Sequence, residues 1–283
     1  MFEIFISLLL GVQSIDKITT SELPELYQIV QTESSRPLVN AKSALILDSK
    51  SGKFLFKKNI NEKLPIASLT KIMTALIIIQ ENNLEETVVI PNEINEIGGS
   101  SMYLVGNEKI SVKNLLYGLL VKSGNDAAYS LAIYNSGDID SFVKKMNKYA
   151  ENLGLNSSNF SNPMGFDSES NYSTAYDLAI LSNYLYKNPE IQKIVATKKI
   201  TVKSEDKKYS HQLDSTNALL DDTAYHVIGF KTGHTDQSGG CFISYANSAH
   251  PKLTVVIGSN QRFHDTKILL DWAEHAFNYI KND

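Results

Sequence analysis

The chain has 283 residues, of which 42% are hydrophobic and 20% charged, and its formal net charge is −4. This composition indicates a globular protein of one large domain or two modest ones, and the absence of a basic stripe argues against a nucleic-acid partner. A single cysteine, Cys241, excludes an internal disulfide. The six histidines lack metal-ligand spacing, so we expect no metal site.

The N-terminal segment has two interpretations. Residues 4–12, "IFISLLLGV", have the length of a signal-peptide apolar region and are too short to span a bilayer. Val12 and Ser14 fit the −3 and −1 places of a cleavage site. Glu3 and the lack of a preceding basic residue favour instead a plain N-terminal helix or a misassigned start. Residues 13–36 are polar and predict a linker.

Hydrophobic periodicity predicts the elements that follow. Two apolar runs, 44–47 and 54–56, predict a β-hairpin around a Ser-Gly turn. Helical periodicity then predicts helices over 68–80, 111–121, 125–135, 139–154 and 173–188, the last with Ser173 as N-cap and Pro189 as its end. Strand-type runs follow at 198–204, 225–233, 240–247 and 252–259, and an amphipathic helix over 265–282 closes the chain.

This order of elements predicts an α+β protein. Strands at both ends of the sequence can share one antiparallel sheet if the helical block, about 68–195, is an insertion between them. We therefore expect a leader or linker over 1–36 and a single catalytic domain over 37–283.

One serine–lysine pair stands out as a candidate catalytic unit. The pattern Ser-x-x-Lys occurs four times, at 14–17, 68–71, 141–144 and 204–207, but only Ser68 and Lys71 have apolar flanks. A serine needs a base, and a lysine can act as one if burial lowers its pKa from about 10.4. Residues three apart share a helix face, so Lys71 is placed to activate Ser68. Backbone N–H groups at the helix start would stabilise an oxyanion.

Two further polar clusters interrupt apolar stretches. Ser123-Gly124-Asn125 lies between two predicted helices and reads either as a functional loop or as a turn in which Asn125 caps the next helix. Lys231-Thr232-Gly233 follows an apolar run and would end or line an edge strand. The alternative there is an exposed lysine at a strand-end turn.

Together the three clusters resemble the three-motif signature of penicillin-binding proteins and serine β-lactamases. Over about 38–280 the chain is most similar to the low-molecular-mass D-alanyl-D-alanine carboxypeptidases, the S11 serine peptidases. The matching stretches are "ASLTKIMTAL", "LLYGLLVKSGNDAAYSLA", "NPMGFD", "YSTAYDLA" and "GFKTGHTDQSGG". The resemblance implies a β-lactamase/transpeptidase-like fold, with an antiparallel sheet flanked by helices and an inserted, mostly helical subdomain.

The resemblance also implies catalytic roles. Ser68 would attack the D-alanyl-D-alanine carbonyl, forming an acyl-enzyme and releasing the terminal D-alanine. Lys71 would be the activating base, and Ser123 would relay a proton to the leaving amine. Water would then hydrolyse the acyl-enzyme, with no metal or organic cofactor.

The remaining motif residues would bind substrate. Asn125 would hold the peptide amide. Lys231 and Thr232, in one strand segment with Gly233 and His234, would bind the terminal carboxylate. The oxyanion hole would combine the backbone N–H groups of the nucleophile and His234. Repulsion from Lys231 would help to keep the catalytic lysine neutral.

These roles imply partners and a location. The substrates would be peptidoglycan stem peptides ending in D-Ala-D-Ala, and β-lactam antibiotics would be covalent inhibitors. We expect an extracytoplasmic location, with membrane contact only through an uncleaved N-terminal segment. Longer family members carry a C-terminal β-domain and an amphipathic membrane anchor. The sequence stops at the closing helix, so we do not expect attachment to the membrane by the C-terminus. Phe166 stands where the family usually has Leu.

Three alternative functions remain open. A D,D-endopeptidase would attack the same bond type in cross-linked peptides. A class A β-lactamase would need a Glu-x-x-x-Asn element, but Glu151 is followed four places on by Leu155. A non-catalytic wall-binding protein would keep the fold without the chemistry.

Overall fold

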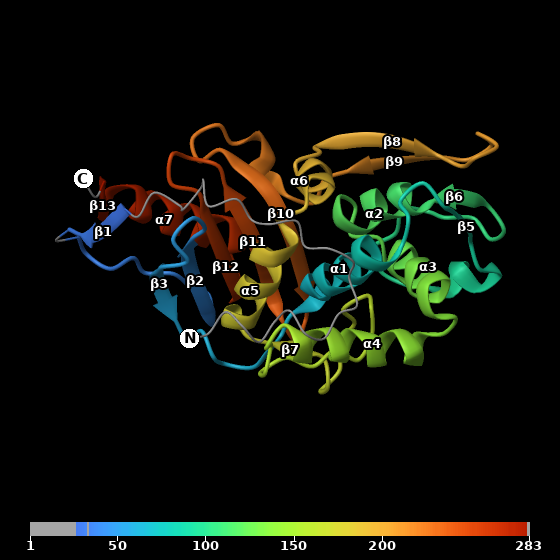
Figure 1. Cartoon of the computed structure of the whole chain (residues 1–283), viewed down its shortest axis with the longest axis horizontal. Helices are drawn as coiled ribbons and strands as arrows, with labels where there is room; N and C mark the ends of the chain where they lie inside the picture. Colours follow the sequence, from blue (N-terminus) through green and yellow to red (C-terminus); the bar gives the residue numbers. More distant parts are fainter. Residues whose placement is uncertain (1–26, 33, 282–283) are drawn as a thin grey trace, which may run out of the picture.

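The computed structural model describes residues 27–32 and 34–281, and at its centre is a five-stranded antiparallel sheet of order β10-β11-β12-β2-β3 (Figure 1). Its strands are β2 Ser43–Asp48, β3 Phe54–Lys58, β10 Val227–Thr235, β11 Gly239–Ala246 and β12 Lys252–Ser259. β2 lies beside β12, more than 200 residues away in sequence. The prediction that strands from both ends of the chain share one sheet is confirmed.

Helices fill the interval between β3 and β10, and one more follows β12. They are α1 Lys71–Glu81, α2 Val112–Leu120, α3 Asn125–Ser136, α4 Ile139–Asn152, α5 Ala175–Leu185, α6 Pro189–Val195 and α7 Arg262–His275. Short 3₁₀ helices cover η1 Ala67–Thr70, η2 Asn92–Glu96 and η3 Ala218–Asp221. The helices expected from periodicity are confirmed, with small shifts at their ends.

Two helix boundaries differ from the prediction. The N-cap of α5 is Thr174 rather than Ser173, because the Thr174 side chain accepts a hydrogen bond from the Asp177 N–H. α5 already ends at Leu185, and Pro189 is the first residue of a further helix, α6. At that position the N–H that proline lacks would have no partner within the helix, so no hydrogen bond is lost. The side chain of Asn188 caps this additional helix.

Four two-stranded pairs lie outside the central sheet. They are β1 Tyr27–Gln31 with β13 Phe277–Lys281, β4 Leu64–Pro65 with β7 Tyr172–Ser173, β5 Thr87–Val89 with β6 Lys109–Ser111, and β8 Lys199–Lys203 with β9 Ser210–Asp214. The strand predicted at 198–204 is thus half of a separate hairpin. In Figure 1 this hairpin extends beside the region formed by helices α1 to α4, which we call the helical region.

Two expectations near the termini are wrong. The closing helix ends at His275, and residues 277–281 form β13 instead of further helix. Its partner β1 lies in the segment predicted as a linker, 13–36. Pairing between distant strands overrides the local helical pattern here. The apolar segment 4–12 lies outside the described residues.

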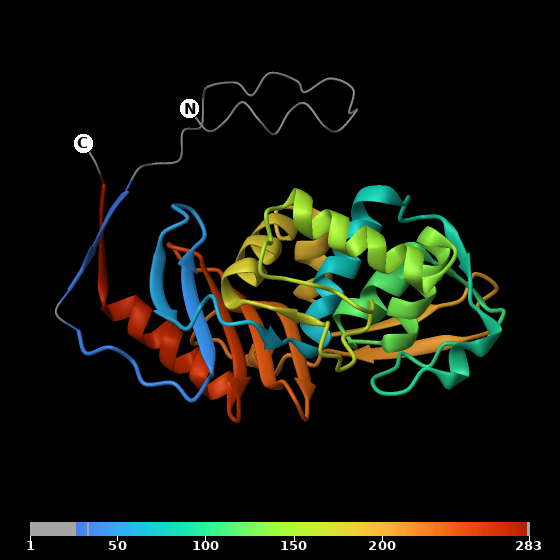
Figure 2. The same ribbon diagram turned by 90° about the horizontal axis from the view of Figure 1, so that it is seen from below.

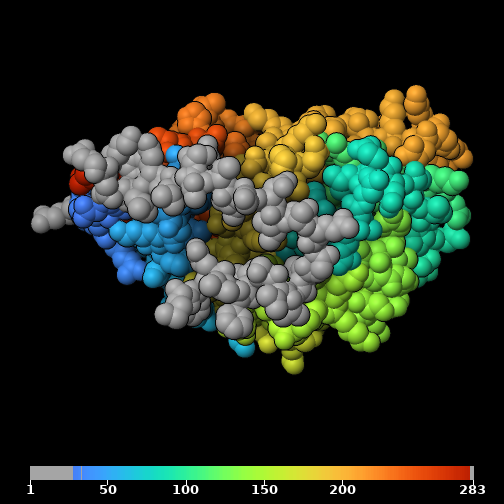
Figure 3. All heavy atoms as spheres, viewed as in Figure 1, coloured from blue at the N-terminus to red at the C-terminus, as the bar shows by residue number. Residues whose placement is uncertain are grey.

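The central sheet is covered on both faces. α7 packs against β11 and β12 on one face, and α5 packs against β2 and β12 on the other, as Figure 2 shows. On the α7 face, Trp272 contacts the ring of Phe56 edge-on at 5.9 Å. The helical region and the β1–β13 pair occupy opposite ends of the molecule (Figure 3).

α1 is the buried axis of the helical region. Every residue from Lys71 to Ile78 is buried, and the apolar ones among them belong to the same core cluster as apolar residues of the sheet. A helix that is apolar on all sides belongs in a core, so the first residue of α1 enters that core with it.

Within the described part of the chain, no helix has both the length and the apolar character needed to cross a bilayer.

Candidate active site

Ser68 and Lys71 meet where η1 passes into α1. The Lys71 amine lies 2.9 Å from Ser68 Oγ. Ser68 is half-buried, whereas Lys71 is fully buried. Ala67, just before the serine, has φ = 47°. Such left-handed backbone in a non-glycine residue stores strain and clusters at functional sites. The spacing and burial expected for this pair are both observed.

Three oxygen atoms surround the buried Lys71 amine. Besides Ser68 Oγ, Nζ lies 2.7 Å from Asn125 Oδ1 and 2.5 Å from the Met164 carbonyl oxygen. Burial lowers the pKa of Lys71 to about 7, against a weaker opposing effect of the Asp126 carboxylate. Near pH 7, a large fraction of this amine is therefore uncharged.

This arrangement suits a neutral amine that acts as a base. A neutral amine has two N–H donors and one lone pair. Nζ is within hydrogen-bond distance of three oxygens and can donate to each as an ammonium. In the neutral form, with Asn125 Oδ1 and the Met164 carbonyl accepting its two N–H bonds, its lone pair would face the Ser68 hydroxyl. The Asn125 amide is oriented by its Nδ2, which donates to Gly98 O at 2.7 Å. The site thus holds an amine in hydrogen-bond contact with a hydroxyl, which is the geometry that a general base and a nucleophile require.

The second motif forms the loop between α2 and α3. Ser123 has φ = 62°, and its side chain is buried. Asn125 is the first residue of α3, while Gly124 holds the N-cap position without a side-chain bond. Of the two readings of this cluster, the one in which Asn125 caps the next helix is wrong, because its amide is bonded to Lys71 and Gly98 instead.

The third motif lies on β10, an edge strand of the central sheet. Lys231 Nζ donates to Ser123 Oγ at 2.7 Å and to Thr232 O at 2.8 Å. Lys231 is 1% exposed, so the alternative of an exposed lysine at a turn is wrong. Lys71 thus joins the first motif to Asn125 of the second, and Lys231 of the third motif is bonded to Ser123 of the second.

Two buried amines in one site affect each other's ionisation. Burial, followed by repulsion from Lys71 and Arg262, lowers the pKa of Lys231 well below its ordinary value. For Lys71 itself the largest cause is burial. A bound carboxylate beside Lys231 would favour its charged form.

Gly233 brings the β10 backbone against the nucleophile. A Cβ on Gly233 would lie 3.1 Å from both the Ser68 nitrogen and the Ile66 carbonyl oxygen. This close approach is available to glycine, which has no side chain. The next residue, His234, is exposed. The backbone on either side of this contact is where the resemblance places the oxyanion hole.

Sequence reasoning assigned no role to the loop that carries Met164. Asn162 Oδ1 accepts hydrogen bonds from the backbone N–H groups of Met164, Gly165 and Phe166, which turns the chain sharply. Gly165 has φ = +88°, and a Cβ there would lie 2.1 Å from Ala67 O. The turn signal Asn-Pro-x-Gly was visible in the sequence, but its contact with the catalytic lysine was not.

Arg262 and Thr216 are also absent from the sequence prediction. Arg262 Nη1 donates to the Gly233 carbonyl oxygen at 3.1 Å, and Thr216 Oγ1 lies 2.6 Å from Thr232 Oγ1. A cavity of about 620 Å³ opens beside β10 and is lined by Arg262 and His234 among others. Of the β10 residues, His234 lines this cavity, whereas Lys231, Thr232 and Gly233 do not; Arg262 links the two through its bond to the Gly233 carbonyl.

The structure offers no alternative metal centre in the described residues, where no group of three or more His, Cys, Asp or Glu side chains is arranged to hold an ion.

Comparisons with known proteins agree with this geometry. A family model described as D-alanyl-D-alanine carboxypeptidase matches residues 30–261. The chain is 37% identical over 244 residues to the D-alanyl-D-alanine carboxypeptidase DacF of Bacillus subtilis, covering 82% of this chain and 62% of that protein.

Solved structures confirm the predicted fold class. The Streptomyces K15 DD-transpeptidase matches with a TM-score of 0.79 and 28% identity, over 85% of this chain and 99% of that one. Penicillin binding protein 6B from Escherichia coli matches with a TM-score of 0.78 and 31% identity, over 86% and 80% of the two chains. The chain spans somewhat less than two thirds of the length of the DacF relative.

Proposed function

Since this chain belongs to the D-alanyl-D-alanine carboxypeptidase family of serine peptidases, we propose that it removes the terminal D-alanine from peptidoglycan stem peptides through an acyl-enzyme on Ser68. The observation that carries this proposal is the environment of Lys71. Its buried amine has two acceptors for its N–H groups and one hydroxyl, that of Ser68, facing its lone pair. A non-catalytic wall-binding protein would have no use for a lysine buried at this cost.

The acylation step follows from these contacts. Ser68 Oγ attacks the carbonyl carbon of the penultimate D-alanine while its proton passes to Lys71 Nζ. The backbone N–H groups of Ser68 and His234 stabilise the negative oxygen that forms. The C–N bond then breaks. The departing nitrogen takes a proton from the Ser123 hydroxyl, and Ser123 in turn takes the proton that Lys71 gained from Ser68. Lys71 is therefore neutral again, and Ser123 is again a hydroxyl, when the acyl-enzyme has formed.

Hydrolysis of the acyl-enzyme regenerates the site. Neutral Lys71 accepts a proton from water, the resulting hydroxide attacks the ester carbonyl, and the proton returns to Ser68 Oγ as the ester bond breaks. A β-lactam would acylate Ser68 by the same first step. Its leaving nitrogen stays tethered to the acyl group, so the drug remains covalently bound.

Recognition of the terminal carboxylate would fall to β10. Lys231 is bonded to Ser123 of the second motif, and the Thr232 hydroxyl is bonded to that of Thr216. Arg262 adds a cation behind Gly233. A free carboxylate is what distinguishes a peptide end from a peptide interior. This cluster therefore favours a carboxypeptidase over an endopeptidase, which must accept a substituted chain there.

The test measures the cleavage of two substrates and the covalent labelling of the protein by a penicillin. The protein is incubated with a pentapeptide ending in D-Ala-D-Ala and, separately, with a cross-linked peptide dimer, and free D-alanine and cleaved dimer are measured. We expect D-alanine release from the pentapeptide to be faster, together with covalent labelling by a fluorescent penicillin at Ser68. Faster dimer cleavage would favour the endopeptidase, and rapid turnover of a chromogenic cephalosporin would favour a β-lactamase.

The approach of Gly233 to Ser68 gives a separate prediction. Gly233→Ala is expected to slow penicillin acylation by about 10²–10³-fold, the usual cost of losing one oxyanion-hole donor. The added Cβ would press on the Ser68 nitrogen at 3.1 Å and displace it. The acylation rate is measured together with the melting temperature. A folded variant that acylates at the wild-type rate would show that this backbone contact has no catalytic role.

The location and the division of the chain are proposed on the same basis. Peptidoglycan stem peptides lie outside the cytoplasmic membrane, so the enzyme would act there. The catalytic domain would cover 37–283, and its helical subdomain, about 68–195, would be inserted between β3 and β10. A leader and linker would lie before β1, since Tyr27–Gln31 pairs with β13. The sharing of one sheet by strands from both ends supports this division.

A further inference from the structure

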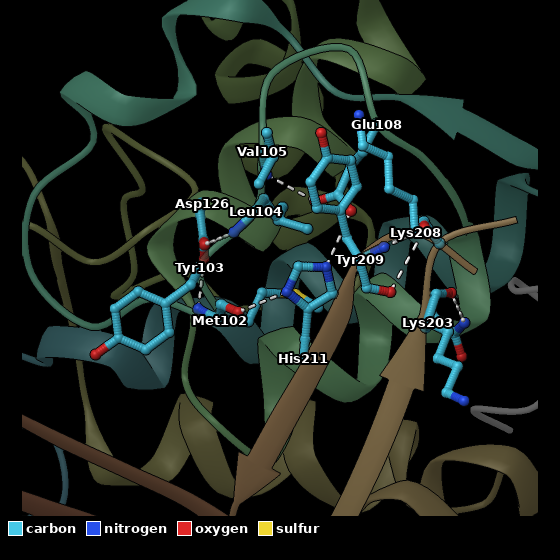
Figure 4. A network of polar contacts seen from close by, with 12 residues as sticks. Met102, Tyr103, Leu104, Val105, Glu108, Asp126, Lys203, Lys208, Tyr209 and His211 are labelled. Atoms are coloured by element: carbon cyan, nitrogen blue, oxygen red, sulfur yellow. Dashed lines mark hydrogen bonds and ion pairs between the residues drawn. The ribbon is translucent and has the colours of Figure 1, made fainter. Parts of the chain in front are cut away.

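A buried histidine–glutamate pair lies outside the three motifs. His211, on β9, and Glu108, just before β6, have side chains that are 4% and 0% exposed. His211 Nε2 lies 3.0 Å from Glu108 Oε2, and its Nδ1 lies 3.1 Å from the Met102 carbonyl oxygen. Figure 4 shows the imidazole ring between these two oxygen atoms. The pair joins the β8–β9 hairpin to the segment 98–104.

Both ring nitrogens of His211 face acceptors. A peptide carbonyl and an ionised carboxylate can only accept, so each nitrogen must carry a proton to form both hydrogen bonds. Only the imidazolium form has two N–H donors. The contacts therefore correspond to an imidazolium at His211. The other oxygen of Glu108 accepts from the Val105 N–H at 2.7 Å.

The Met102 carbonyl belongs to a segment that shapes the active site. On the other side of the same residue, the Met102 N–H donates to Asp126 Oδ1 at 3.0 Å. Asp126 Oδ2 accepts from the Leu104 N–H and from the Ser101 hydroxyl. The carboxylate of Asp126, in the first turn of α3, is thus held by this segment.

The same segment orients Asn125 directly. The Asn125 backbone N–H donates to Ser100 O at 2.6 Å, and its side-chain Nδ2 donates to Gly98 O at 2.7 Å. The side-chain oxygen Oδ1 of Asn125 accepts from Lys71. A shift of the segment 98–104 would therefore rotate the Asn125 side-chain amide, which holds the proposed base.

We propose that His211 is a positioning residue for the peptidase reaction. As an imidazolium bonded to Glu108 and to the Met102 carbonyl, it fixes the segment 98–104 and thereby the amide of Asn125. The inference rests on the proposed function, because the positioned amide is the one that serves the Ser68–Lys71 pair.

Loss of the His211 proton would act at the Met102 carbonyl. A neutral imidazole has one donor, and its stronger bond is to the carboxylate. Nδ1 would then present a lone pair to the Met102 oxygen at a distance set for a hydrogen bond. Two acceptors at that distance repel, so we expect the segment to move.

The charged surroundings favour the protonated form at neutral pH. Desolvation acts to lower the pKa of His211, but the hydrogen bond and charge of Glu108, the Met102 carbonyl and the Asp126 charge together raise it above its ordinary value. Further charged and titratable groups lie at a cavity of about 400 Å³ beside the pair: Lys109, Glu205, Asp206, Lys208 and Tyr209. Because the folded-state pKa is raised, the stabilisation is complete below the unfolded-state pKa of about 6.5. It is lost as pH rises through the folded-state value.

Two variants separate the hydrogen bond from the charge. His211→Phe removes the donor to Met102 and is expected to lower the second-order rate of penicillin acylation about tenfold, on the scale of one lost charge-assisted hydrogen bond. In Glu108→Gln, the amide can donate to Nε2 of a neutral His211, whose Nδ1–H still reaches Met102. We expect this variant to acylate at close to the wild-type rate near pH 7 and to lose the wild-type decline at high pH.

A matched control tests whether any lost ion pair has the same effect. Lys145 on α4 pairs with Glu81 at 2.6 Å, both partly buried and outside this network. Lys145→Gln should lower the melting temperature and leave the acylation rate and its pH profile unchanged. An equal loss of acylation in Lys145→Gln, or wild-type acylation and pH dependence in His211→Phe, would overturn the inference.

A spectroscopic measurement decides the protonation state without activity. The ¹⁵N shifts of the imidazole, assigned by comparison with His211→Phe, should show two protonated nitrogens at pH 6.5 in the wild type and one in Glu108→Gln. A neutral His211 in the wild type at pH 6.5 would overturn the inference even if the variants are slow or unfolded. Absence of penicillin labelling at Ser68 in the wild type would instead contradict the proposed function.

Discussion

Ser68→Ala is expected to abolish both D-alanine release and covalent penicillin labelling, with a loss on the order of 10⁶-fold in kcat, as for removal of a serine-peptidase nucleophile. The reason is that Ser68 Oγ is the hydroxyl in contact with the buried Lys71 amine. The readouts are released D-alanine and labelled protein. The variant should keep its fold, because it loses one half-buried hydroxyl.

The chain supplies a matched control for this variant. Ser141 begins another Ser-x-x-Lys pattern, but its hydroxyl bonds to Asp138 at the exposed start of α4. Ser141→Ala should lose a small part of its stability and retain full labelling. Labelling that survives in Ser68→Ala, or is lost in Ser141→Ala, would contradict the assignment of the nucleophile.

Lys71→Arg is expected to slow acylation by about 10³–10⁴-fold, because it places a permanent positive charge where a neutral amine is needed. General-base catalysis is commonly worth about 10²–10⁴-fold, and a guanidinium, with a pKa above 12, cannot accept the Ser68 proton. Lys71→Met removes the base and the charge together and should lose a similar factor. The measurement is the rate of penicillin acylation at pH 8.

Lys144→Met is the control for the lysine variants, because Lys144 is the exposed lysine of the Ser141 pattern. It should acylate like the wild type. If Lys71→Arg retained wild-type acylation, Lys71 would act through its charge and not as a base.

The local parts of the site could be predicted from the sequence. The Ser68–Lys71 contact needs only residues three apart on a helical turn and the apolar flanks that bury Lys71. The edge-strand position of Lys231 follows from the apolar run before it. The shared sheet also followed from the order of strand and helix patterns along the chain.

The long-range parts could not be predicted in this way. Lys71 is bonded to the Met164 carbonyl, 93 residues away. Because the acceptor is a backbone oxygen, which every residue has, the residue type at position 164 does not reveal the contact. The pattern over 277–282 predicted a continuation of the preceding helix. These residues form a strand instead, because their backbone groups pair with those of β1 at the other end of the described chain. The burial of Glu108 with His211 likewise depends on where the β8–β9 hairpin folds.

The most direct test of the central claim is the pH dependence of penicillin acylation. An uncharged Lys71 amine is proposed to take the Ser68 proton, and burial lowers the pKa of that amine to about 7. The neutral fraction then rises about tenfold between pH 6 and 8, so the ascending limb of the profile should have its midpoint near pH 7 and be absent in Lys71→Met. An ascending limb centred near pH 10, or an acylation rate that does not change between pH 6 and 8, would contradict the claim.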